Sequence, residues 1–239
     1  MSIQGFAEWL ETPQGRYVLD WEQAKHDQLV ADIFGFNAVQ LGWPGLDYLR
    51  ANRMPFRFRC DDGNGIVQAR GDLHSLPLAG NSVDLVVLPH VLEFDANPHQ
   101  ILREVERVLV PEGSVVVTGF NPYSLWGARR SLARREQLPP FGGSYISVPR
   151  LKDWFALLGL EPHAGAFGCY VPAVTQEKWL RRFRFLDAAG DRWWPIGGAV
   201  YVIQAIKRQV GMRLLTPVWH DRKARAKALM PVAQKTDQQ

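Results

Sequence analysis

The sequence of 239 residues predicts an α/β fold, in which helices cover both faces of a largely parallel sheet. Short apolar runs alternate with segments of helical periodicity, and turns rich in Gly and Pro separate them. Two of the runs, at 83–88 and 114–118, are almost continuously apolar, as in strands that are buried on both faces. No internal repeat or low-complexity block interrupts the pattern. At this length we expect a single domain with one large core.

The first third of the chain is predicted to begin with a helix, which Asp20 can cap and Gly35 can end. A short apolar strand and a two-glycine loop at 42–45 follow it. Residues 56–60 alternate between apolar and polar, and the Asp-Asp-Gly-Asn-Gly sequence after them is typical of a turn. In order, the elements expected here are a helix at 20–35, a strand at 38–41, a short helix at 46–52, and strands at 56–60 and 67–69.

The same alternation continues through the rest of the chain. Asn97 and Pro98 are expected at the cap and the first position of a helix that stops at 111–113. Pro149 is expected to open a later helix, which Gly159 ends. In order, the elements expected here are a strand at 83–88, the helix from 98, a strand at 114–118, the helix from 149, and strands at 167–171 and 199–205.

Composition excludes several classes of protein. The chain is 46% hydrophobic and 22% charged, with 21 Gly and 16 Pro, which excludes disordered, collagen-like and disulfide-rich proteins. The wide spacing of Cys60 and Cys169 excludes a CxxC site and indicates a reducing compartment. The histidines form no HxxxH or HExxH pair, so no metal site is expected. Because we find neither a membrane-spanning apolar run nor a signal-peptide pattern, we expect a cytoplasmic protein without an integral membrane segment.

Positive charge is concentrated in the C-terminal part of the sequence. Residues 207–239 carry eight Lys and Arg against two Asp, a net charge of +6, whereas the whole chain has a net charge of +4. We therefore expect a basic, partly disordered tail at 207–239 after a domain at 1–206. Such a tail can serve solubility, contact nucleic acid or contact an anionic membrane, and the sequence leaves these alternatives open.

In sheets of this class, ligands bind beyond the carboxyl ends of the strands, near the point where the strand order reverses. Four groups of residues directly follow expected strands. They are the loop at 42–45, the pair Asp61 and Asp62, Asp72, and the segment 89–94. These groups are the candidate ligand-binding residues.

The stretch from 71 to 113 carries several motifs in a fixed order. They are Gly71-Asp72 after a short strand, Leu76-Pro77-Leu78, Ser82-Val83-Asp84 before the next strand, and the Arg-Val-Leu-Val-Pro-Glu-Gly sequence of 107–113. This block resembles the middle of class I methyltransferases of the type 11 kind, which use S-adenosylmethionine (SAM). The resemblance is closest over 67–120, weaker over 145–207, where 197–207 is similar to the closing strand, and least before 66. It implies a Rossmann-like sheet of seven strands and SAM as cofactor.

The resemblance also implies roles for individual residues. In the family, an acidic residue after the third strand contacts the adenine amino group, which points to Asp72, with the Leu73 backbone beside it. Pro89 and His90 would flank the methionine end of SAM. The alternatives are that Asp72 only caps the turn at 73–76, and that His90 is a pocket-wall or hydrogen-bonded core residue rather than a catalytic base.

The first glycine loop departs from the family pattern of an acidic residue followed by three spaced glycines. Gln40 stands where the acid is common, and the loop keeps only Gly42 and Gly45, with the bulky Trp43 between them. These two glycines are expected to approach the cofactor. A plain strand-to-helix turn would have the same sequence.

A carboxylate that accepts both ribose hydroxyls is expected to end the second strand. Asp61 lies 19 residues after Gly42, which fits the usual spacing of about 20. However, 62–66 is too short for a crossover helix to the next strand. Either the two strands form an irregular local pair or the strand assignment is shifted. Asp61 and Asp62 can alternatively be turn formers.

On the substrate side, no residue stands out as a catalytic acid or base, and methyl transfer depends largely on positioning. Aromatic residues could line an acceptor pocket, and arginines could bind an anionic substrate or RNA phosphates. The alternatives are core packing for the aromatics and solvated helix faces for the arginines. The residues in question are Tyr123, Trp126, Tyr145, Trp193 and Trp194, and Arg129, Arg130, Arg134, Arg135, Arg181, Arg182 and Arg184.

The sequence therefore favours a SAM-dependent methyltransferase that acts on a small molecule or an RNA base. Residues 35–120 would form its cofactor-binding core, and 121–206 its substrate-side and closing elements. The alternative is a binding or scaffold protein that keeps the fold but has lost SAM through its altered glycine loop. An NAD-binding Rossmann protein is disfavoured because G-x-G-x-x-G is absent.

Overall fold

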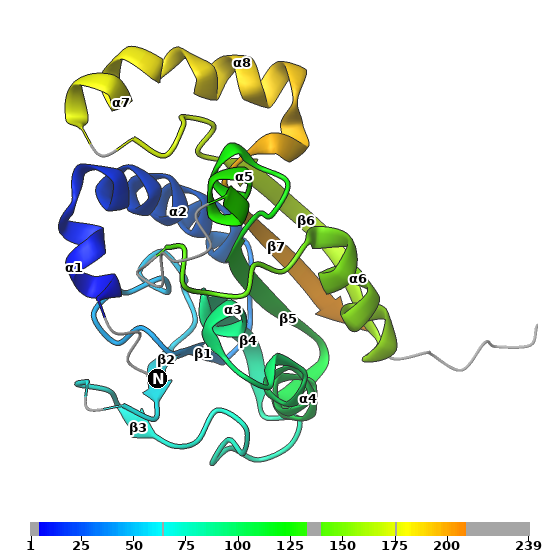
Figure 1. The fold of residues 1–239 in the computed structure, drawn as a ribbon. Coiled ribbons are helices and arrows are strands. Elements are labelled where there is room, and N and C mark those ends of the chain that lie inside the picture. Colours follow the sequence, from blue (N-terminus) through cyan, green and yellow to red (C-terminus); the bar gives the residue numbers. More distant parts are fainter. Residues whose placement is uncertain (1–4, 64, 133–139, 175, 209–239) are drawn as a thin grey trace, which may run out of the picture. The chain divides into compact units, whose positions relative to one another are not determined.

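Seven strands form one sheet in the order β3-β2-β1-β4-β5-β7-β6 (Figure 1). The computed structural model describes residues 5–63, 65–132, 140–174 and 176–208. The pairs β3–β2, β2–β1, β1–β4 and β4–β5 are parallel, and β7 is antiparallel to both β5 and β6. The strands are β1 (Asn37–Leu41), β2 (Phe56–Asp61), β3 (Ala69–Arg70), β4 (Val83–Pro89), β5 (Leu109–Phe120), β6 (Leu160–Gly168) and β7 (Val200–Lys207). The predicted fold class is confirmed.

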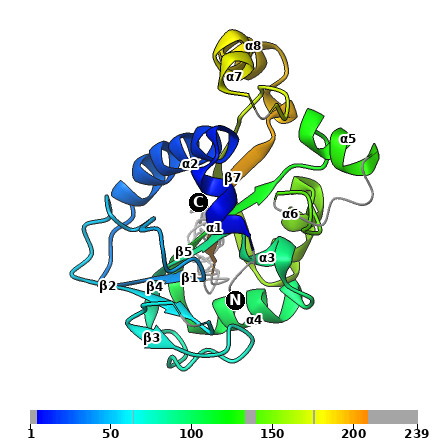
Figure 2. The same cartoon turned by 60° about the vertical axis from the view of Figure 1, so that its left-hand side comes forward.

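Helices lie on both faces of this sheet, with α2 on one side and α4 and α6 on the other (Figure 2). The helices are α1 (Phe6–Glu11), α2 (Pro13–Ala31), α3 (Val91–Phe94), α4 (Pro98–Val108), α5 (Leu125–Leu132), α6 (Val148–Leu157), α7 (Glu177–Phe183) and α8 (Phe185–Trp193), with a 3-10 turn at Pro195–Gly197. Helices α7 and α8 belong to the connection from the end of β6 to the start of β7.

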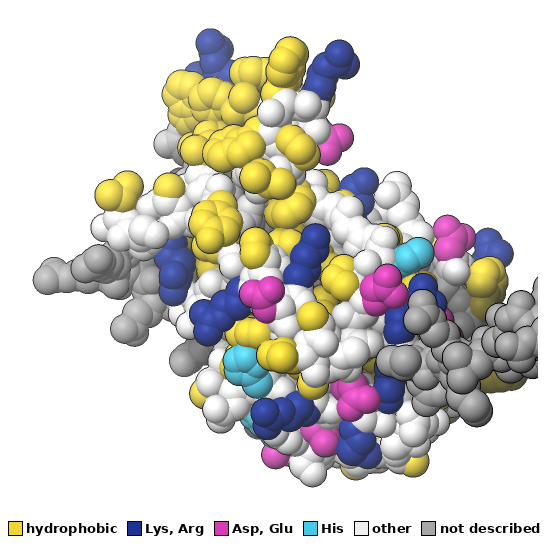
Figure 3. Space-filling view, turned by 90° about the vertical axis from the view of Figure 1, so that its right-hand side faces the viewer, with side chains coloured by type: hydrophobic (Ala, Val, Ile, Leu, Met, Phe, Trp, Pro, Cys, Tyr) yellow, Lys and Arg dark blue, Asp and Glu magenta, His cyan; other side chains and the backbone are white. Residues whose placement is uncertain are grey.

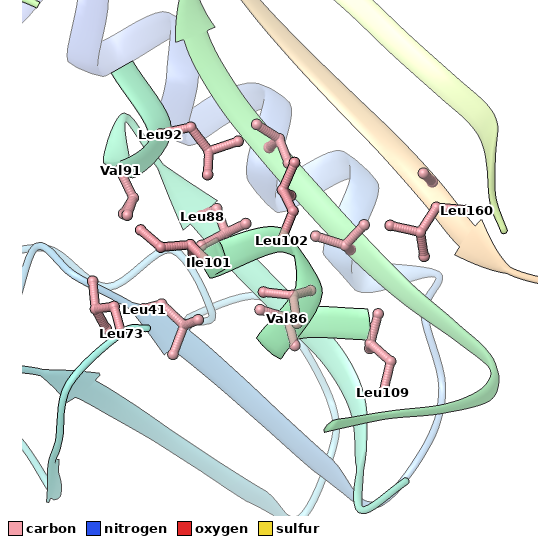
Figure 4. Close-up of a cluster of buried hydrophobic side chains, with 14 of the residues drawn as sticks. Leu41, Leu73, Val86, Leu88, Val91, Leu92, Ile101, Leu102, Leu109 and Leu160 are labelled. Atoms are coloured by element: carbon pink, nitrogen blue, oxygen red, sulfur yellow. The ribbon is translucent and has the colours of Figure 1, made fainter. Parts of the chain in front are cut away.

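The core has a cluster on each face of the sheet. On one face, Ile101 and Leu102 of α4 and Phe155 of α6 are fully buried against the strands (Figure 4). On the other face, Val30 of α2 packs with Tyr48 against β1, β4, β5 and β7. Burial on both faces explains why β4 and β5 are almost continuously apolar.

Several element boundaries differ from the sequence prediction. Helix α2 starts at Pro13 rather than at Asp20, because the Thr12 hydroxyl accepts a hydrogen bond from Gly15 N (3.1 Å) and Pro13 suits the first turn. The predicted helix at 46–52 is wrong, since this segment consists of turns. Strand β6 begins at Leu160, directly after α6, so the predicted strand at 167–171 is mostly wrong.

The predicted stop of the helix from Pro98 at 111–113 is also wrong. Helix α4 ends at Val108, and the chain enters β5 at once. The pairing of β5 with β4 shifts in register between the pairs Val83–Leu109 and Leu85–Ser114, so 110–113 form an irregular insertion within the strand. Glu112 has φ 64° in this insertion.

Strands β2 and β3 form a short, irregular local pair. This is the first of the two alternatives for the short connection at 62–66, the other being a shifted strand assignment. Only two residue pairs form, Cys60 with Ala69 and Asp61 with Arg70, and β3 lies slightly after the predicted 67–69. Two pairs are enough to align the ends of β2 and β3 without a crossover helix. The expected strand assignments in β1, β2, β4 and β7 otherwise agree closely with the structure.

Within the described residues, no helix is both long and apolar enough to cross a bilayer, and no group of His, Cys, Asp and Glu could hold a metal ion. Apart from Lys207 and Arg208, the predicted tail at 207–239 lies outside the described residues.

Candidate active site

The loops after β1, β2, β3 and β4 meet at the carboxyl-terminal edge of the sheet. The strand order reverses between β1 and β4, because the chain runs from β1 outward to β3 and then returns to β4 on the other side. Such a reversal point is where open α/β sheets bind their ligands. All the candidate ligand-binding residues named from the sequence were expected in loops or at strand ends on this edge.

Gly42 is required by the loop after β1, whereas Gly45 is not. Gly42 has φ +73°, and a Cβ atom at this position would lie 2.9 Å from Cγ2 of Val91. A Cβ at Gly45 would meet nothing within 4 Å. Trp43 also adopts a positive φ of 55°, which is unfavourable for a bulky residue. The loop therefore has a specific, strained conformation.

Gln40 explains why the usual acidic residue is absent. Its side-chain Nε2 donates to the carbonyl oxygens of Trp43 (2.9 Å) and Leu46 (2.9 Å), and its Oε1 accepts from Tyr48 N (2.9 Å). A carboxylate could not donate to these carbonyl groups. The buried amide thus fixes the segment from Gly42 to Tyr48, which also explains why 46–52 is not helical.

Asp61 and Asp72 lie at neighbouring strand ends. Asp61 is the last residue of β2, is buried, and accepts a hydrogen bond from Gly63 N (3.2 Å). The backbone N of Gly71 donates to the Asp61 carbonyl (3.3 Å), which joins the two loops. Leu73 is buried in the core, so only its backbone could contact a ligand.

The carboxylate of Asp72 is 61% exposed at the end of β3. Its Oδ1 accepts from the backbone N of His74 (2.9 Å) and pairs with the His74 ring (2.9 Å), whose other nitrogen pairs with Asp95 (2.9 Å). These hydrogen bonds lower the pKa of Asp72. The hydrogen bond to Asp95 is the main reason why the pKa of His74 is raised. Asp72 is thus an ionised acceptor that also stabilises its own turn.

An open hollow of about 490 Å³ lies beside this carboxylate. Its lining includes Asp72, His74, Asn97, His99, Gln100 and Arg103, which come from the loop after β3 and the start of α4. The hollow offers both acceptors and donors to a polar ring.

His90 follows β4, but its imidazole points into the protein. It has φ 52°, its backbone N donates to the Thr118 carbonyl (3.0 Å), and its ring is 1% exposed. Nε2 lies 2.6 Å from Oε1 of Glu22, and Nδ1 is hydrogen-bonded to Glu93. This placement agrees with the alternative of a hydrogen-bonded core residue. Pro89, the last residue of β4, is likewise buried.

The two carboxylates that hold His90 extend into a buried polar network. Glu22 of α2 also accepts from the Tyr48 hydroxyl (2.9 Å), and Glu93 accepts from Phe120 N (2.8 Å). Burial alone would disfavour the imidazolium, but Glu22 and Glu93 outweigh it and raise the pKa of His90 to about 10. The network therefore contains a charged histidine that links α2 to the ends of β4 and β5.

Helix α1 covers the point between the loops after β1 and β4. The ring of Phe6 lies 4.1 Å from that of Trp43 and 5.5 Å from that of His90, measured between centroids. Phe6 is buried and belongs to an aromatic cluster with Trp9, Phe120 and other residues of this edge. Phe6 and Glu22 were not predicted as site residues, because only their long-range contacts reveal them.

Three buried polar atoms around this cluster have no hydrogen-bond partner within the described part of the chain. They are Nε1 of Trp9, Nε1 of Trp43 and the hydroxyl of Tyr145. An unpartnered buried donor costs about 1–3 kcal/mol. A polar ligand group at this edge could satisfy them.

The predicted substrate-side residues separate into two groups. Trp126 and Tyr145 pack in the aromatic cluster, and Nε1 of Trp126 donates to the Val171 carbonyl (2.8 Å). Tyr123, Trp193 and Trp194 are exposed. Among the arginines, Arg130 donates to the Phe141 carbonyl (2.9 Å) and its guanidinium lies 4.9 Å from the Tyr145 ring centroid. Arg129 donates to the Ala173 carbonyl, Arg181, Arg182 and Arg184 are exposed, and Arg134 and Arg135 lie outside the described residues.

Comparisons with known proteins agree with this fold. The model of the methyltransferase domain family matches residues 50–117. Escherichia coli (strain K12) YafS is 38% identical over 161 residues, which are 66% of this chain and 67% of YafS. Among solved structures, the methyltransferase bound to the Trm112 activator of Haloferax volcanii has a TM-score of 0.60 at 18% identity, over 87% of this chain and 98% of that one. A SAM-dependent methyltransferase of Thermotoga maritima has a TM-score of 0.58 at 16% identity, over 81% and 97%.

Proposed function

Since this chain belongs to the class I SAM-dependent methyltransferase family, we propose that it transfers the methyl group of SAM directly to a small molecule or an RNA base. The family and the fold imply SAM as cofactor. What we propose beyond the family and its cofactor is the class of methyl acceptor, a small molecule or an RNA base.

The exposed carboxylate of Asp72 is the observation that supports SAM binding in this proposal. It is an ionised acceptor beside an open hollow, and an exocyclic amine such as that of adenine donates hydrogen bonds. The adjoining Asp61 at the end of β2 stands where a carboxylate would accept the ribose hydroxyls. These two carboxylates support a position of the adenosine half of SAM at this edge.

The methionine half of SAM would lie between the loops after β1 and β4. Gly42 lets the backbone of the first loop approach a ligand, and the unpartnered Trp43 Nε1 and Tyr145 hydroxyl could donate to a carboxylate. Phe6 fills part of this space, so α1 must move for the methionine end to enter. Pro89 and His90 would support the wall of this half through their backbone.

When bound, SAM supplies an electrophilic methyl group on a sulfonium. The residues of this chain would hold and orient the two reactants, which is the main requirement of an in-line displacement. We assign no catalytic acid or base, because His90 is already held between two carboxylates.

Incubation with SAM that carries a labelled methyl group, together with separated small-molecule and RNA fractions of a cell extract, tests the acceptor. We expect label in one fraction, with strong loss in Asp72→Ala. If RNA is the acceptor, the full-length variant with Arg222, Lys223 and Arg225 changed to Gln should bind RNA more weakly and with a smaller salt slope. Label in neither fraction would contradict the proposed acceptor classes.

A binding or scaffold protein is the second candidate function. The contacts of Phe6 with Trp43 and His90 favour it, because the Phe6 ring packs where we propose that the methionine half of SAM enters. One structural relative was solved with a protein activator of methyltransferases, and we propose a protein as the partner of such a module. SAM binding separates the two functions, since only the enzyme requires it.

A further inference from the structure

Exposed apolar side chains occur along α7, α8 and the 3-10 turn after them. We call this surface the α7–α8 face and define it by five exposed side chains. They are Trp179, Phe185, Trp193, Trp194 and Ile196. Phe185, Trp193 and Ile196 are 64%, 80% and 61% exposed. Figure 3 shows hydrophobic side chains gathered over this end of the molecule, with Lys and Arg at the margins. Exposed apolar patches of this kind usually mark interaction sites.

Residues on the inner side of α7 and α8 make the contacts that hold these helices on the domain. Leu180 is buried, and Asp187 accepts hydrogen bonds from the Tyr17 hydroxyl (2.5 Å) and from Tyr170 N (3.0 Å). Gly190 packs closely on the Tyr170 ring. The outer aromatic side chains are therefore not needed to hold the helices in place.

Basic residues surround the α7–α8 face. Five cations are exposed there, namely Lys178, Arg181, Arg182, Arg184 and Arg192, against the exposed carboxylates of Glu177 and Asp191. Within the described residues, none of the five is held in an ion pair. The face thus combines an apolar centre with an excess of unpaired positive charge at its edge.

We infer that the α7–α8 face docks onto a lipid bilayer with anionic headgroups. Tryptophan and phenylalanine with adjacent Lys and Arg are the composition of helices that lie in the bilayer interface. The side chains project outward, with Trp193 at 80% exposure, whereas a protein partner would need a closely complementary surface to bury them. A bilayer accommodates projecting rings without such a match. Unpaired cations complement anionic headgroups and add to the affinity.

The α7–α8 face lies at the same edge of the sheet as the candidate active site. Helices α7 and α8 leave the sheet at the end of β6 and return at the start of β7, which is the edge that carries the candidate active site. Docking would therefore turn this edge toward the membrane. The docking itself does not depend on the proposed function, because it is measured without SAM.

Co-sedimentation of the full chain with vesicles tests the inference. The probes are vesicles of phosphatidylcholine alone and of phosphatidylcholine with phosphatidylglycerol, at low and high salt. We expect binding to the anionic vesicles to be at least about tenfold tighter, and to weaken with salt. Absence of binding to either kind of vesicle would overturn the inference.

Two full-length variants locate the binding surface. Phe185→Ser with Trp193→Ser removes projecting rings and should weaken vesicle binding about tenfold. The matched control is Phe34→Ser with Phe36→Ser, since these residues are 74% and 73% exposed next to the start of β1. Arg181→Gln with Arg182→Gln should also weaken binding about tenfold. Its control is Arg53→Gln with Lys152→Gln, both exposed elsewhere.

Other occupants of the face give different results. If the variant with Arg222, Lys223 and Arg225 changed to Gln loses vesicle binding while both face variants retain it, the basic tail binds the membrane and the inference is wrong. If light scattering shows a dimer that only the Phe185→Ser, Trp193→Ser variant disrupts, and vesicles do not bind, the occupant is a second copy of the chain. Circular dichroism of every variant confirms that a loss of binding does not reflect unfolding.

Discussion

At the scale of single residues, the carboxylate of Asp72 has a structural and a potential cofactor-binding role. One oxygen stabilises the turn through His74, and the exposed side chain faces an open hollow. In Asp72→Ala, we expect the affinity for SAM to fall about tenfold, since a hydrogen-bond acceptor for adenine is lost. Asp153→Ala, on the exposed surface of α6, is the control and should bind SAM normally. Unchanged affinity in a folded Asp72→Ala protein would contradict the assignment.

The two glycines of the first loop provide a matched pair. Gly42→Ala forces a Cβ atom into a left-handed conformation 2.9 Å from Val91, so it should lower the free energy of unfolding by about 1–2 kcal/mol. SAM binding should weaken as well, because the loop must shift. Gly45→Ala meets open space and should change neither property. Thermal unfolding and SAM titration measure both effects, and equal behaviour of the two variants would contradict the geometry of the loop.

The buried contact between Glu22 and His90 should stabilise the fold in a pH-dependent way. Because the carboxylates raise the pKa of His90 from 6.5 to about 10, this stabilisation is complete below about pH 6.5 and is lost as the pH rises toward 10. Glu22→Gln should lower the free energy of unfolding by about 3–5 kcal/mol at neutral pH, because the buried His90 imidazolium loses the carboxylate that compensates its charge. It should also flatten the dependence on pH between 7 and 10.

Asp27→Asn is the control for this prediction. Asp27 lies on the same helix but pairs with Arg50 at the surface (2.6 Å), so its loss should have little effect. Denaturant unfolding at several pH values makes the comparison. An equally steep pH dependence in native protein and Glu22→Gln would show that this contact does not hold the proton.

Residue types at strand ends could be predicted from the sequence, whereas partners from distant segments could not. Gly42, Asp61 and Asp72 were predicted as site residues because each comes shortly after a predicted strand, and the structure places them at or just after the ends of β1, β2 and β3. Glu22 contacts His90 across 68 positions, and no local pattern indicates such a contact. A hydrogen-bonded core position for His90 was one of the alternatives that the sequence offered, but its partner Glu22 could not be identified from the sequence.

At the scale of elements, helices and strands were predicted correctly where the apolar pattern in the sequence matches the side of the element that is buried. Strand β4 has a nearly continuous apolar pattern and helix α4 has an apolar stripe after Pro98, and both start at the predicted residue. The helix expected at 46–52 failed because the Gln40 amide binds the backbone of this segment in turns. Helices α1, α7 and α8 were not predicted at all, because they are short and lack strong start signals.

Helix α1 should leave its place when SAM binds, because Phe6 lies where the methionine end would enter. In Phe6→Ala we expect the affinity for SAM to rise about tenfold, since less free energy is needed to open the site. Stability should fall by about 3–5 kcal/mol. Phe155→Ala in α6 is the matched control, because Phe155 is equally buried but distant in the sequence from the site loops.

Hydrogen exchange gives a second measurement of the same prediction. Amides of α1 should exchange faster in the presence of SAM, while those of α6 should not. Weaker SAM binding in Phe6→Ala, together with unchanged or slower exchange in α1, would show that this helix is a fixed wall of the pocket.

At the scale of the whole molecule, family and fold are consistent with each other, but the first glycine loop departs from the family pattern. The strand order and the segment 50–117 are those of SAM-dependent methyltransferases. The amide of Gln40 holds the first glycine loop, and Phe6 packs against the loops after β1 and β4. The central claim is that SAM still binds at this edge.

Isothermal titration of the full chain with SAM and, separately, with S-adenosylhomocysteine tests this claim most directly. We predict binding of one molecule per chain, with a dissociation constant in the micromolar range and a rise in the unfolding temperature. No heat and no thermal stabilisation at millimolar SAM would contradict the account. In that case the fold would serve as a binding or scaffold module.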